Sequence, residues 1–375
     1  MGLGTQERKP LTKKEIDKIF KDHRSIEKKK QIMSKEWYSL RSILGNDWAI
    51  FYFLLGGREA GKSYATTEFF VRQWKNRKRP FVWLRLSESS MRKLLQNNAE
   101  KLIDPDLRRR YNLDLVTNGS NVYEVIERDP ETNKVRKKEL MARVLSLATF
   151  YNDKGSGLFD KDFLNDPNMY YNICLDEMNR EASERNSFDI LYNFANQIEN
   201  LVRSTKDRLR IICIGNTLEE ASDLLCAFDY LPETFGRFYL RGKRAVIDYI
   251  EPSDVYLERR KGTVADILMP TASTFTNEIK VDSSLVTKQR LTSPKAIISF
   301  NKYEKFTLWN DNIIAPYNNE SCGLRIAMRP YLDQLFSVEQ RDNIVSIFDT
   351  RGFQFRNLIT FKKFQKQMQL LKPRK

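Results

Sequence analysis

Residues 48–63 read WAIFYFLLGGREAGKS, and this stretch decides the fold. Its first half is a continuous apolar and aromatic run of strand length, which is typical of a strand buried on both faces of a sheet. The run ends directly at Gly56 and Gly57, so we expect a buried strand to enter a glycine-rich loop. Residues 63–74 have helical character, and the order strand, glycine loop, helix is the context of a phosphate-binding loop.

The loop itself, GGREAGKS, fits the pattern G-x-x-x-x-G-K-[ST]. Phosphate oxygens need several converging donors, and glycine lets the backbone come close and adopt positive φ. The helix that begins near Lys62 adds the positive end of its dipole. We expect Lys62 to contact the β and γ phosphates of ATP and the Ser63 hydroxyl to ligate Mg²⁺. An accidental glycine turn is the alternative to a nucleotide-binding loop made of Gly56, Gly57, Arg58, Glu59, Ala60, Gly61, Lys62 and Ser63.

Further apolar runs extend this pattern along the chain. Three of them predict buried strands, at 80–86, 170–177 and 209–216, and helices are expected between them at 89–103 and 188–204. Alternating strands and helices over roughly 50–240 imply an α/β fold, a mostly parallel sheet with helices on both faces. The turn-rich DPETNK predicts a hairpin within 121–147.

Changes in residue composition and spacing divide the chain into three expected parts. Residues 1–45 combine many lysines with isoleucine and phenylalanine at partly helical spacing, which indicates a basic helical extension. That extension is either a nucleic-acid arm or a solvated helix packed on the main domain. Residues 46–245 form the expected P-loop ATPase domain. Residues 246–375 are expected to form a smaller mixed α/β domain, with a hairpin at 295–311 and a helix at 330–348.

Asp176 and Glu177 end an apolar strand, where a P-loop ATPase needs two acids with different tasks. Asp176 is expected to hold Mg²⁺, and Glu177 to orient and polarise the water that attacks the γ phosphate. Adjacent acids favour turnover over binding alone, although a pair of solvated strand-terminal acids is the alternative.

Other polar residues follow the fourth strand and precede it. Asn216 ends the strand and could reach the γ phosphate or the attacking water, or it could form a plain turn. Arg203 follows an amphipathic helix and is joined shortly by Arg208 and Arg210, and one of them could stabilise transition-state charge at a neighbouring subunit's site. Spacing alone leaves open which one does so.

The composition limits which binding partners and which cellular compartment are expected. The 375 residues carry 64 Lys and Arg against 49 Asp and Glu, a formal charge of +15, which favours nucleic acid as a partner. Four dispersed cysteines argue against disulfides and zinc, and a single histidine argues against chemistry built on a histidine base. The sequence shows neither a membrane span nor a secretory signal, so a cytoplasmic protein is expected.

These motifs together resemble the additional-strand P-loop ATPases of viral genome packaging, the large terminase subunits and the packaging ATPases of small short-tailed phages with protein-primed genomes. The likeness rests on GGREAGKSY, FVWLRL, ICLDEMNRE and LVRSTKDRLRIICIGNT, and it covers residues 48–240. It implies that Arg58, inside the phosphate loop, takes part in catalysis and that Arg203 is the arginine supplied in trans. In large terminases the second domain is an RNase H-like nuclease. Here Ser299 and Asn301 stand where its aspartate should be, which implies a vestigial nuclease domain that grips DNA.

The resemblance implies an ATP-hydrolysing motor that moves double-stranded DNA into a viral procapsid. Its partners would be DNA, a homo-oligomeric ring, with five subunits as the family expectation, and a procapsid or portal, with a packaging RNA left open. The place of action would be the host cytoplasm, transiently at the procapsid vertex. The alternatives are a helicase or AAA-like DNA-remodelling ATPase, a full terminase that also cuts DNA, and a nucleotide-dependent binding module that hardly hydrolyses ATP.

Overall fold

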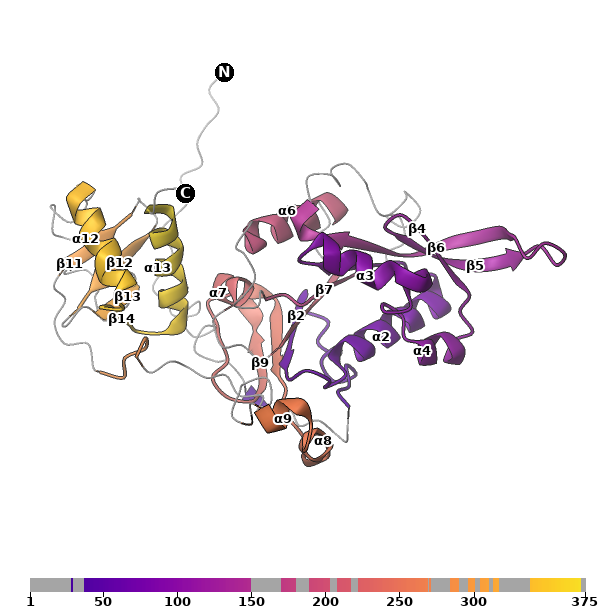
Figure 1. The fold of residues 1–375 in the computed structure, drawn as a ribbon, viewed down its shortest axis with the longest axis horizontal. Helices are drawn as coiled ribbons and strands as arrows, with labels where there is room; N and C mark the ends of the chain where they lie inside the picture. Colours follow the sequence, from indigo (N-terminus) through magenta and orange to yellow (C-terminus); the bar gives the residue numbers. More distant parts are fainter. Residues whose placement is uncertain are drawn as a thin grey trace, which may run out of the picture. The chain divides into compact units, whose positions relative to one another are not determined.

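The chain forms two compact units, residues 1–217 with 232–278 and residues 218–231 with 279–375 (Figure 1). The first unit therefore extends past the expected boundary at 245, and the second takes in a segment from the middle of the chain. The computed structural model describes residues 28–29, 37–149, 170–179, 189–202, 208–216, 222–268, 270, 284–289, 296–300, 304–309, 313–316 and 338–371.

A ten-stranded sheet organises the first unit, in the order β1-β9-β10-β2-β8-β7-β3-β6-β5-β4. Neighbouring strands from β10 to β6 run parallel, and the strands at both edges are antiparallel. The mostly parallel α/β sheet is thus confirmed. The strands are β1 Lys28–Lys29, β2 Phe51–Gly56, β3 Phe81–Arg85, β4 Leu115–Asn118, β5 Asn121–Arg128, β6 Val135–Ser146, β7 Tyr171–Asp176, β8 Leu209–Asn216, β9 Gly236–Leu240 and β10 Ala245–Tyr249.

The order of the central strands places the functional loops at one edge of the sheet. Strand β8 lies between β2, which leads into the phosphate loop, and β7, which ends in the paired acids. This is the additional-strand arrangement that the resemblance implies. Because the strands are parallel, the carboxyl ends of β2, β3, β7 and β8 meet at the same edge, where ligands bind in open α/β sheets.

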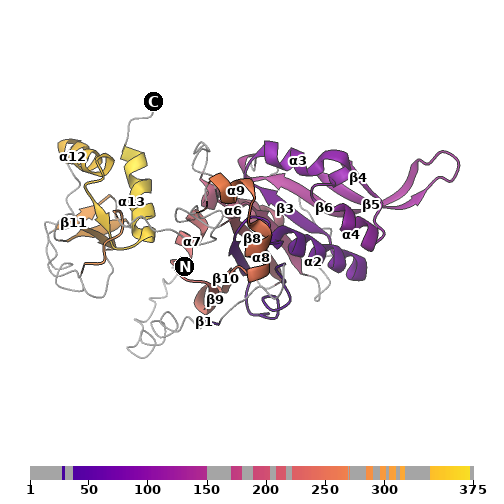
Figure 2. The same ribbon diagram turned by 60° about the horizontal axis from the view of Figure 1, so that its bottom comes forward.

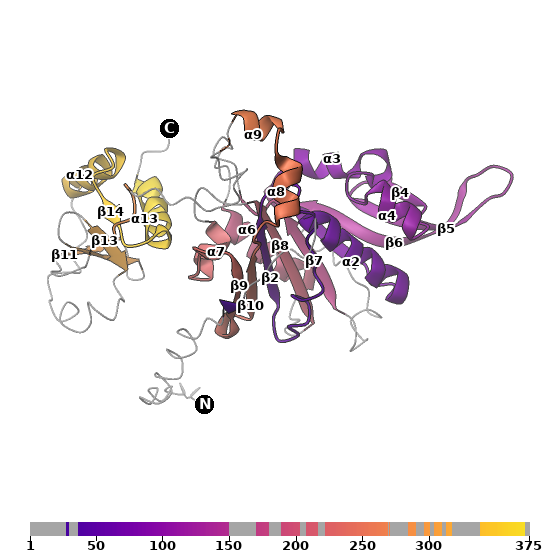
Figure 3. The same cartoon turned by 90° about the horizontal axis from the view of Figure 1, so that it is seen from below.

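Helices cover both faces of this sheet, as predicted. Helix α2 packs on one face through Phe69, Phe70, Val71 and Trp74, and α6 lies on the opposite side of the parallel strands (Figures 1 and 3). The backbone of α3 leaves helical geometry at residues 96–98. The helices of this unit are α2 Lys62–Arg77, α3 Glu88–Ala99, α4 Pro105–Arg110, α6 Ile190–Val202, α8 Asp254–Arg260, α9 Val264–Leu268 and the short η2 Arg241–Lys243.

The predicted hairpin within 121–147 is present as β5 and β6, and Figure 2 shows its tip projecting from the sheet. Asp129 shapes the turn by accepting hydrogen bonds from the backbone N–H groups of Glu131 and Thr132. The far end of β6 pairs in parallel with β3, so one long strand serves both the hairpin and the central sheet.

Of residues 1–45, the structure describes 28–29 and 37–45, and the helix expected over the earlier residues lies outside the described residues. Lys28–Lys29 pairs with β9 as a short antiparallel strand, and residues 37–45 form turns and bends. Tyr38, Leu40 and Ile43 are buried in the core that contains α2. Residues 37–45 therefore belong to the body of the first unit.

The second unit contains a four-stranded mixed sheet, in the order β11-β12-β13-β14. The predicted hairpin at 295–311 is present as β11 and β12, and its core gathers around the ring of Phe364. Its elements are α7 Asp223–Ala227, β11 Ala296–Ser299, β12 Lys305–Leu308, β13 Ile313–Pro316, α12 Val338–Asp349, β14 Gln354–Phe355 and α13 Leu358–Leu371. Within the described residues of the whole chain, every helix is too short or too polar to cross a membrane.

Candidate active site

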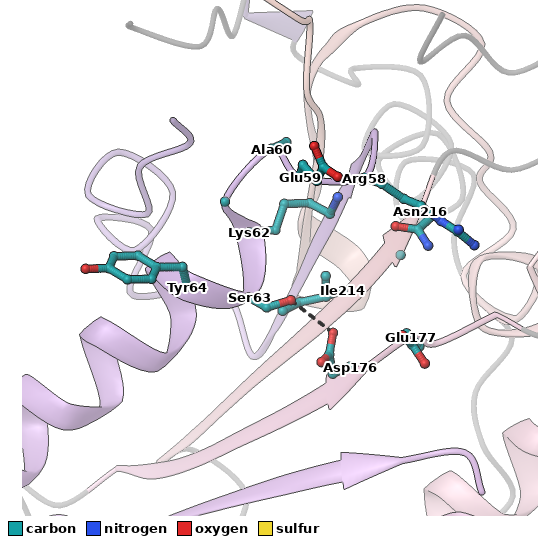
Figure 4. Close-up of a pocket in the computed structure, with 12 residues that line it drawn as sticks. Arg58, Glu59, Ala60, Lys62, Ser63, Tyr64, Asp176, Glu177, Ile214 and Asn216 are labelled. Atoms are coloured by element: carbon teal, nitrogen blue, oxygen red, sulfur yellow. Dashed lines mark hydrogen bonds between the residues drawn. The ribbon is translucent and has the colours of Figure 1, made fainter. Parts of the chain in front are cut away.

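A cavity of about 580 Å³ opens at the carboxyl edge of the parallel strands (Figure 4). Its volume falls in the range of small-molecule sites. Every residue expected to bind phosphate except Gly56 and Gly57 lines it, together with both acids and Asn216. The lining residues are Arg58, Glu59, Ala60, Gly61, Lys62, Ser63, Tyr64, Asp176, Glu177, Ile214, Gly215 and Asn216.

The phosphate loop turns sharply between β2 and α2. Gly61 adopts φ +83°, and a Cβ at this position would lie 3.2 Å from the ring of Trp37. Only glycine meets both conditions without strain. Helix α2 begins at the next residue, Lys62, so the amino-terminal end of its dipole faces the cavity.

Lys62 is almost completely buried, with 5% of its surface exposed. Its Nζ donates to the carbonyl oxygens of Gly56 at 2.9 Å and Gly57 at 2.6 Å. Burial lowers the pKa of Lys62 to about 8, and the nearby charge of Asp176 partly offsets that effect. The ammonium group is thus held inside the loop by two backbone carbonyl oxygens that phosphate oxygens could replace.

Ser63 and Asp176 come together although they are far apart in the sequence. The Ser63 hydroxyl donates to Asp176 Oδ1 at 3.2 Å, as the dashed line in Figure 4 shows. A hydroxyl and a carboxylate beside a phosphate loop are hard oxygen ligands, which suit Mg²⁺ when phosphate oxygens and water complete its shell. The donor set therefore fits the expected metal.

Arg85, at the end of β3, joins the two acids and was not anticipated. Its Nη1 lies 2.7 Å from Asp176 Oδ2 and its Nη2 lies 2.7 Å from Glu177 Oε2. Glu177 has φ +57°, and its side chain is 55% exposed, so the ion pair fixes an otherwise open carboxylate. A signal for Arg85 does exist in the sequence, because it is the charged residue near the carboxyl end of an apolar strand, where site residues gather.

Asn216 ends β8 and lines the cavity, in agreement with its predicted place. The residue before it, Gly215, packs closely against the segment that follows β7. A Cβ on Gly215 would lie 2.9 Å from both Asn179 Nδ2 and Met178 Cε. A larger residue there would force the ends of both side chains to shift, so the segment after β7 packs closely on β8 beside Asn216.

The three candidate arginines for action in trans differ in their surroundings. Arg203 lies outside the described residues. Arg210 stands at the amino-terminal end of β8, at the opposite end of that strand from Asn216. Its guanidinium stacks over Tyr170 at 4.7 Å and Phe69 at 5.1 Å, and it donates to Asn172. The contacts of the Arg210 side chain are therefore made within its own chain.

The arrangement supplies a cation, two oxygen groups suited to Mg²⁺ and a nearby carboxylate around one cavity. Such a set can hold a polyphosphate chain and orient water for in-line attack on its terminal phosphorus.

Comparison with known proteins gives structural matches only. No family model and no curated protein match the sequence. The Phi-28 gp11 DNA packaging motor is 14% identical with a TM-score of 0.57, over 91% of this chain and 100% of that chain. The bacteriophage Phi-29 viral genome packaging motor assembly is 17% identical with a TM-score of 0.57, over 90% and 100%. The resemblance to viral packaging ATPases is thus confirmed at the level of the fold, which this chain shares with the phage packaging motors over nearly its whole length.

Proposed function

We propose that the protein is an ATP-hydrolysing motor that moves double-stranded DNA into a viral procapsid. The observation that carries this proposal is the assembly of Lys62, the Ser63–Asp176 pair and Glu177 around one cavity, in a fold shared with phage packaging motors. Those two proteins are motors of DNA and viral genome packaging, and the net charge of +15 suits a polyanionic partner.

Each residue has a distinct task in hydrolysis. Lys62 leaves the carbonyls of Gly56 and Gly57 and binds the β and γ phosphates. Ser63 and Asp176 hold Mg²⁺, which when bound neutralises charge on the phosphate oxygens. Glu177 orients and polarises the attacking water.

Two further residues of the cavity complete the proposed site. Asn216 contacts the γ phosphate or that water from the end of β8. Arg58, on the loop itself, provides a second cation for the charge that develops during transfer.

A ring of subunits follows from an arginine supplied in trans. Arg203 precedes β8 and fits this role in the resemblance, and five subunits are the family expectation. DNA would pass through the centre of the ring, and the ring would dock on a procapsid or portal in the host cytoplasm, with or without a packaging RNA.

The decisive experiment measures ATP hydrolysis with and without double-stranded DNA and purified empty procapsids. Protection of DNA from nuclease inside the procapsid, dependent on ATP, supports the motor. Lys62→Ala should lose ATP binding, and Glu177→Gln should retain bound MgATP without hydrolysis. Strand separation without a procapsid would instead identify a helicase, and binding without turnover would identify a passive module.

We further propose that the second unit is a vestigial RNase H-like domain that grips DNA. The proposal rests on its mixed sheet and on Ser299 and Asn301, which replace the expected acid, although Asn301 lies outside the described residues. Incubation of plasmid with Mg²⁺ or Mn²⁺ tests it. Cleavage would show that the nuclease is active and that the protein is a full terminase.

A further inference from the structure

Helix α8 holds the phosphate loop from outside the cavity. The Tyr256 hydroxyl donates to the carbonyl oxygen of Arg58 at 2.8 Å, and Arg260 Nη1 donates to the same oxygen at 3.1 Å. Arg259 Nη2 donates to the carbonyl oxygen of Glu59 at 2.8 Å. Two consecutive peptide groups of the loop are therefore tied to one helix that lies about 200 residues further along the chain.

This attachment is built into the core of the first unit. Tyr256 is 0% exposed and Arg260 is 5% exposed, one helical turn apart on the same face of α8. Ser253 caps the helix by accepting a hydrogen bond from the Tyr256 N–H at 3.1 Å. A buried guanidinium is unfavourable unless it is paired, and Arg260 meets the Arg58 carbonyl and, at 3.9 Å, the Glu59 carboxylate.

A third carbonyl of the loop is held from another direction. The oxygen of Ala60 accepts a hydrogen bond from the Tyr38 N–H at 3.0 Å. In a trans peptide the carbonyl of one residue and the N–H of the next point in opposite directions. The carbonyls of Arg58, Glu59 and Ala60 point out of the loop, toward α8 and Tyr38. The N–H groups of Glu59, Ala60 and Gly61 therefore point in the opposite direction, into the loop. Successive N–H groups aligned in this way form an anion-binding concavity.

We propose that Tyr256 and Arg260 are positioning residues for the phosphates of ATP. They act through the peptide group between Arg58 and Glu59. By binding its carbonyl oxygen, they orient the N–H group of Glu59 into the loop before the nucleotide binds. This inference rests on the proposed ATP-binding function and adds α8 to the nucleotide site. Since preorganised donors need no rearrangement on binding, their loss should weaken phosphate affinity.

The test compares Tyr256→Phe, Arg260→Met and Arg260→Lys in the full-length protein. Dissociation constants are measured by calorimetry for MgATP and for magnesium with inorganic triphosphate, which lacks the base. Tyr256→Phe should weaken both by about 3- to 10-fold, as expected for a lost neutral hydrogen bond. Arg260→Met should weaken both by about 10- to 100-fold because a charged donor is lost, and Arg260→Lys should recover part of that affinity.

Tyr123→Phe on the distant β5 is the matched control, and it should bind both ligands as wild type does. Unchanged affinities in both Tyr256→Phe and Arg260→Met would overturn the inference. Weaker binding of ATP but not of triphosphate would also overturn it, because α8 would then serve the base. A wild-type protein that binds neither ligand would instead refute the proposed function.

Discussion

The buried ammonium of Lys62 should make ATP binding weaken at a lower pH than an ordinary lysine would allow. Burial lowers the pKa of Lys62 from 10.5 to about 8 in the nucleotide-free protein. Bound phosphates stabilise the charged ammonium, so the pKa in the ATP complex is higher. Above pH 8 the free protein has lost a proton that the complex retains, and binding must take that proton up. Affinity is therefore constant below about pH 8 and falls above it.

The size of the effect follows from the pKa of the free protein. The apparent dissociation constant rises by the factor 1 + 10^(pH − pKa), which is about 1.1 at pH 7 and about 11 at pH 9 for a pKa of about 8. Each further pH unit costs roughly 1.4 kcal/mol until the complex also titrates. A lysine with the ordinary pKa of 10.5 would change the constant by only about 3% at pH 9.

Calorimetry between pH 7.5 and 9.5 measures this dependence, because phosphate groups are already ionised above about pH 7.5. Titrations in two buffers of different ionisation enthalpy should show uptake of up to one proton above pH 8. Lys62→Arg is the matched control, since its guanidinium stays charged and should bind with no such slope. An affinity that is flat to pH 9, or the same slope in Lys62→Arg, would refute a titrating buried lysine.

The remaining predictions concern other charged groups of the protein. Arg85→Met should lower kcat about 10²-fold with little change in KM, because Glu177 loses the ion pair that positions it. A wild-type kcat in steady-state kinetics would contradict this. Asp248→Asn should reduce the free energy of unfolding by about 3–5 kcal/mol in urea titrations, because it leaves the buried Arg237 guanidinium without its carboxylate; a loss below about 1 kcal/mol would speak against the pair. Rings of Arg203→Ala mixed with Glu177→Gln should regain some hydrolysis at mixed interfaces, whereas no regain would place Arg203 in cis. Binding to duplex DNA should fall steeply with salt and be the same for unrelated sequences, and a filter-binding assay showing strong sequence preference would oppose a packaging motor.

The parts of the site that depend on local pattern could be predicted from the sequence. The phosphate loop, the paired acids and Asn216 each follow an apolar strand, and parallel pairing brings those strand ends to one edge. The role of Arg85 could not be predicted because its partner Asp176 lies 91 residues away in the sequence. Tyr256 and Arg260 were missed for the same reason, since no short pattern connects α8 with the loop.

Long-range pairing also explains a difference in the bounds of the first unit. At Lys28–Lys29 the chain forms a short strand that pairs with Phe238 and Arg237 of β9. The expected boundary at 245 falls at the first residue of β10. That strand carries a buried carboxylate, Asp248, which reads as polar in the sequence but is neutralised by Arg237 in the neighbouring strand.

The hydrogen bonds of the phosphate loop imply that Lys62 is the side chain that must move when ATP binds. The carbonyls of Arg58, Glu59 and Ala60 are bound by α8 and by the Tyr38 backbone, and the carbonyl of Gly61 accepts the Ala65 N–H within α2. The carbonyl oxygens of Gly56 and Gly57 each accept a hydrogen bond from Lys62 Nζ. Apart from the hydrogen bonds of the sheet, this is the only donor to them among the described residues. When Lys62 turns to the phosphates, the loop can therefore keep its shape. Turning Lys62 breaks only its two hydrogen bonds to the carbonyls of Gly56 and Gly57, and the negative phosphates would replace those carbonyls as acceptors.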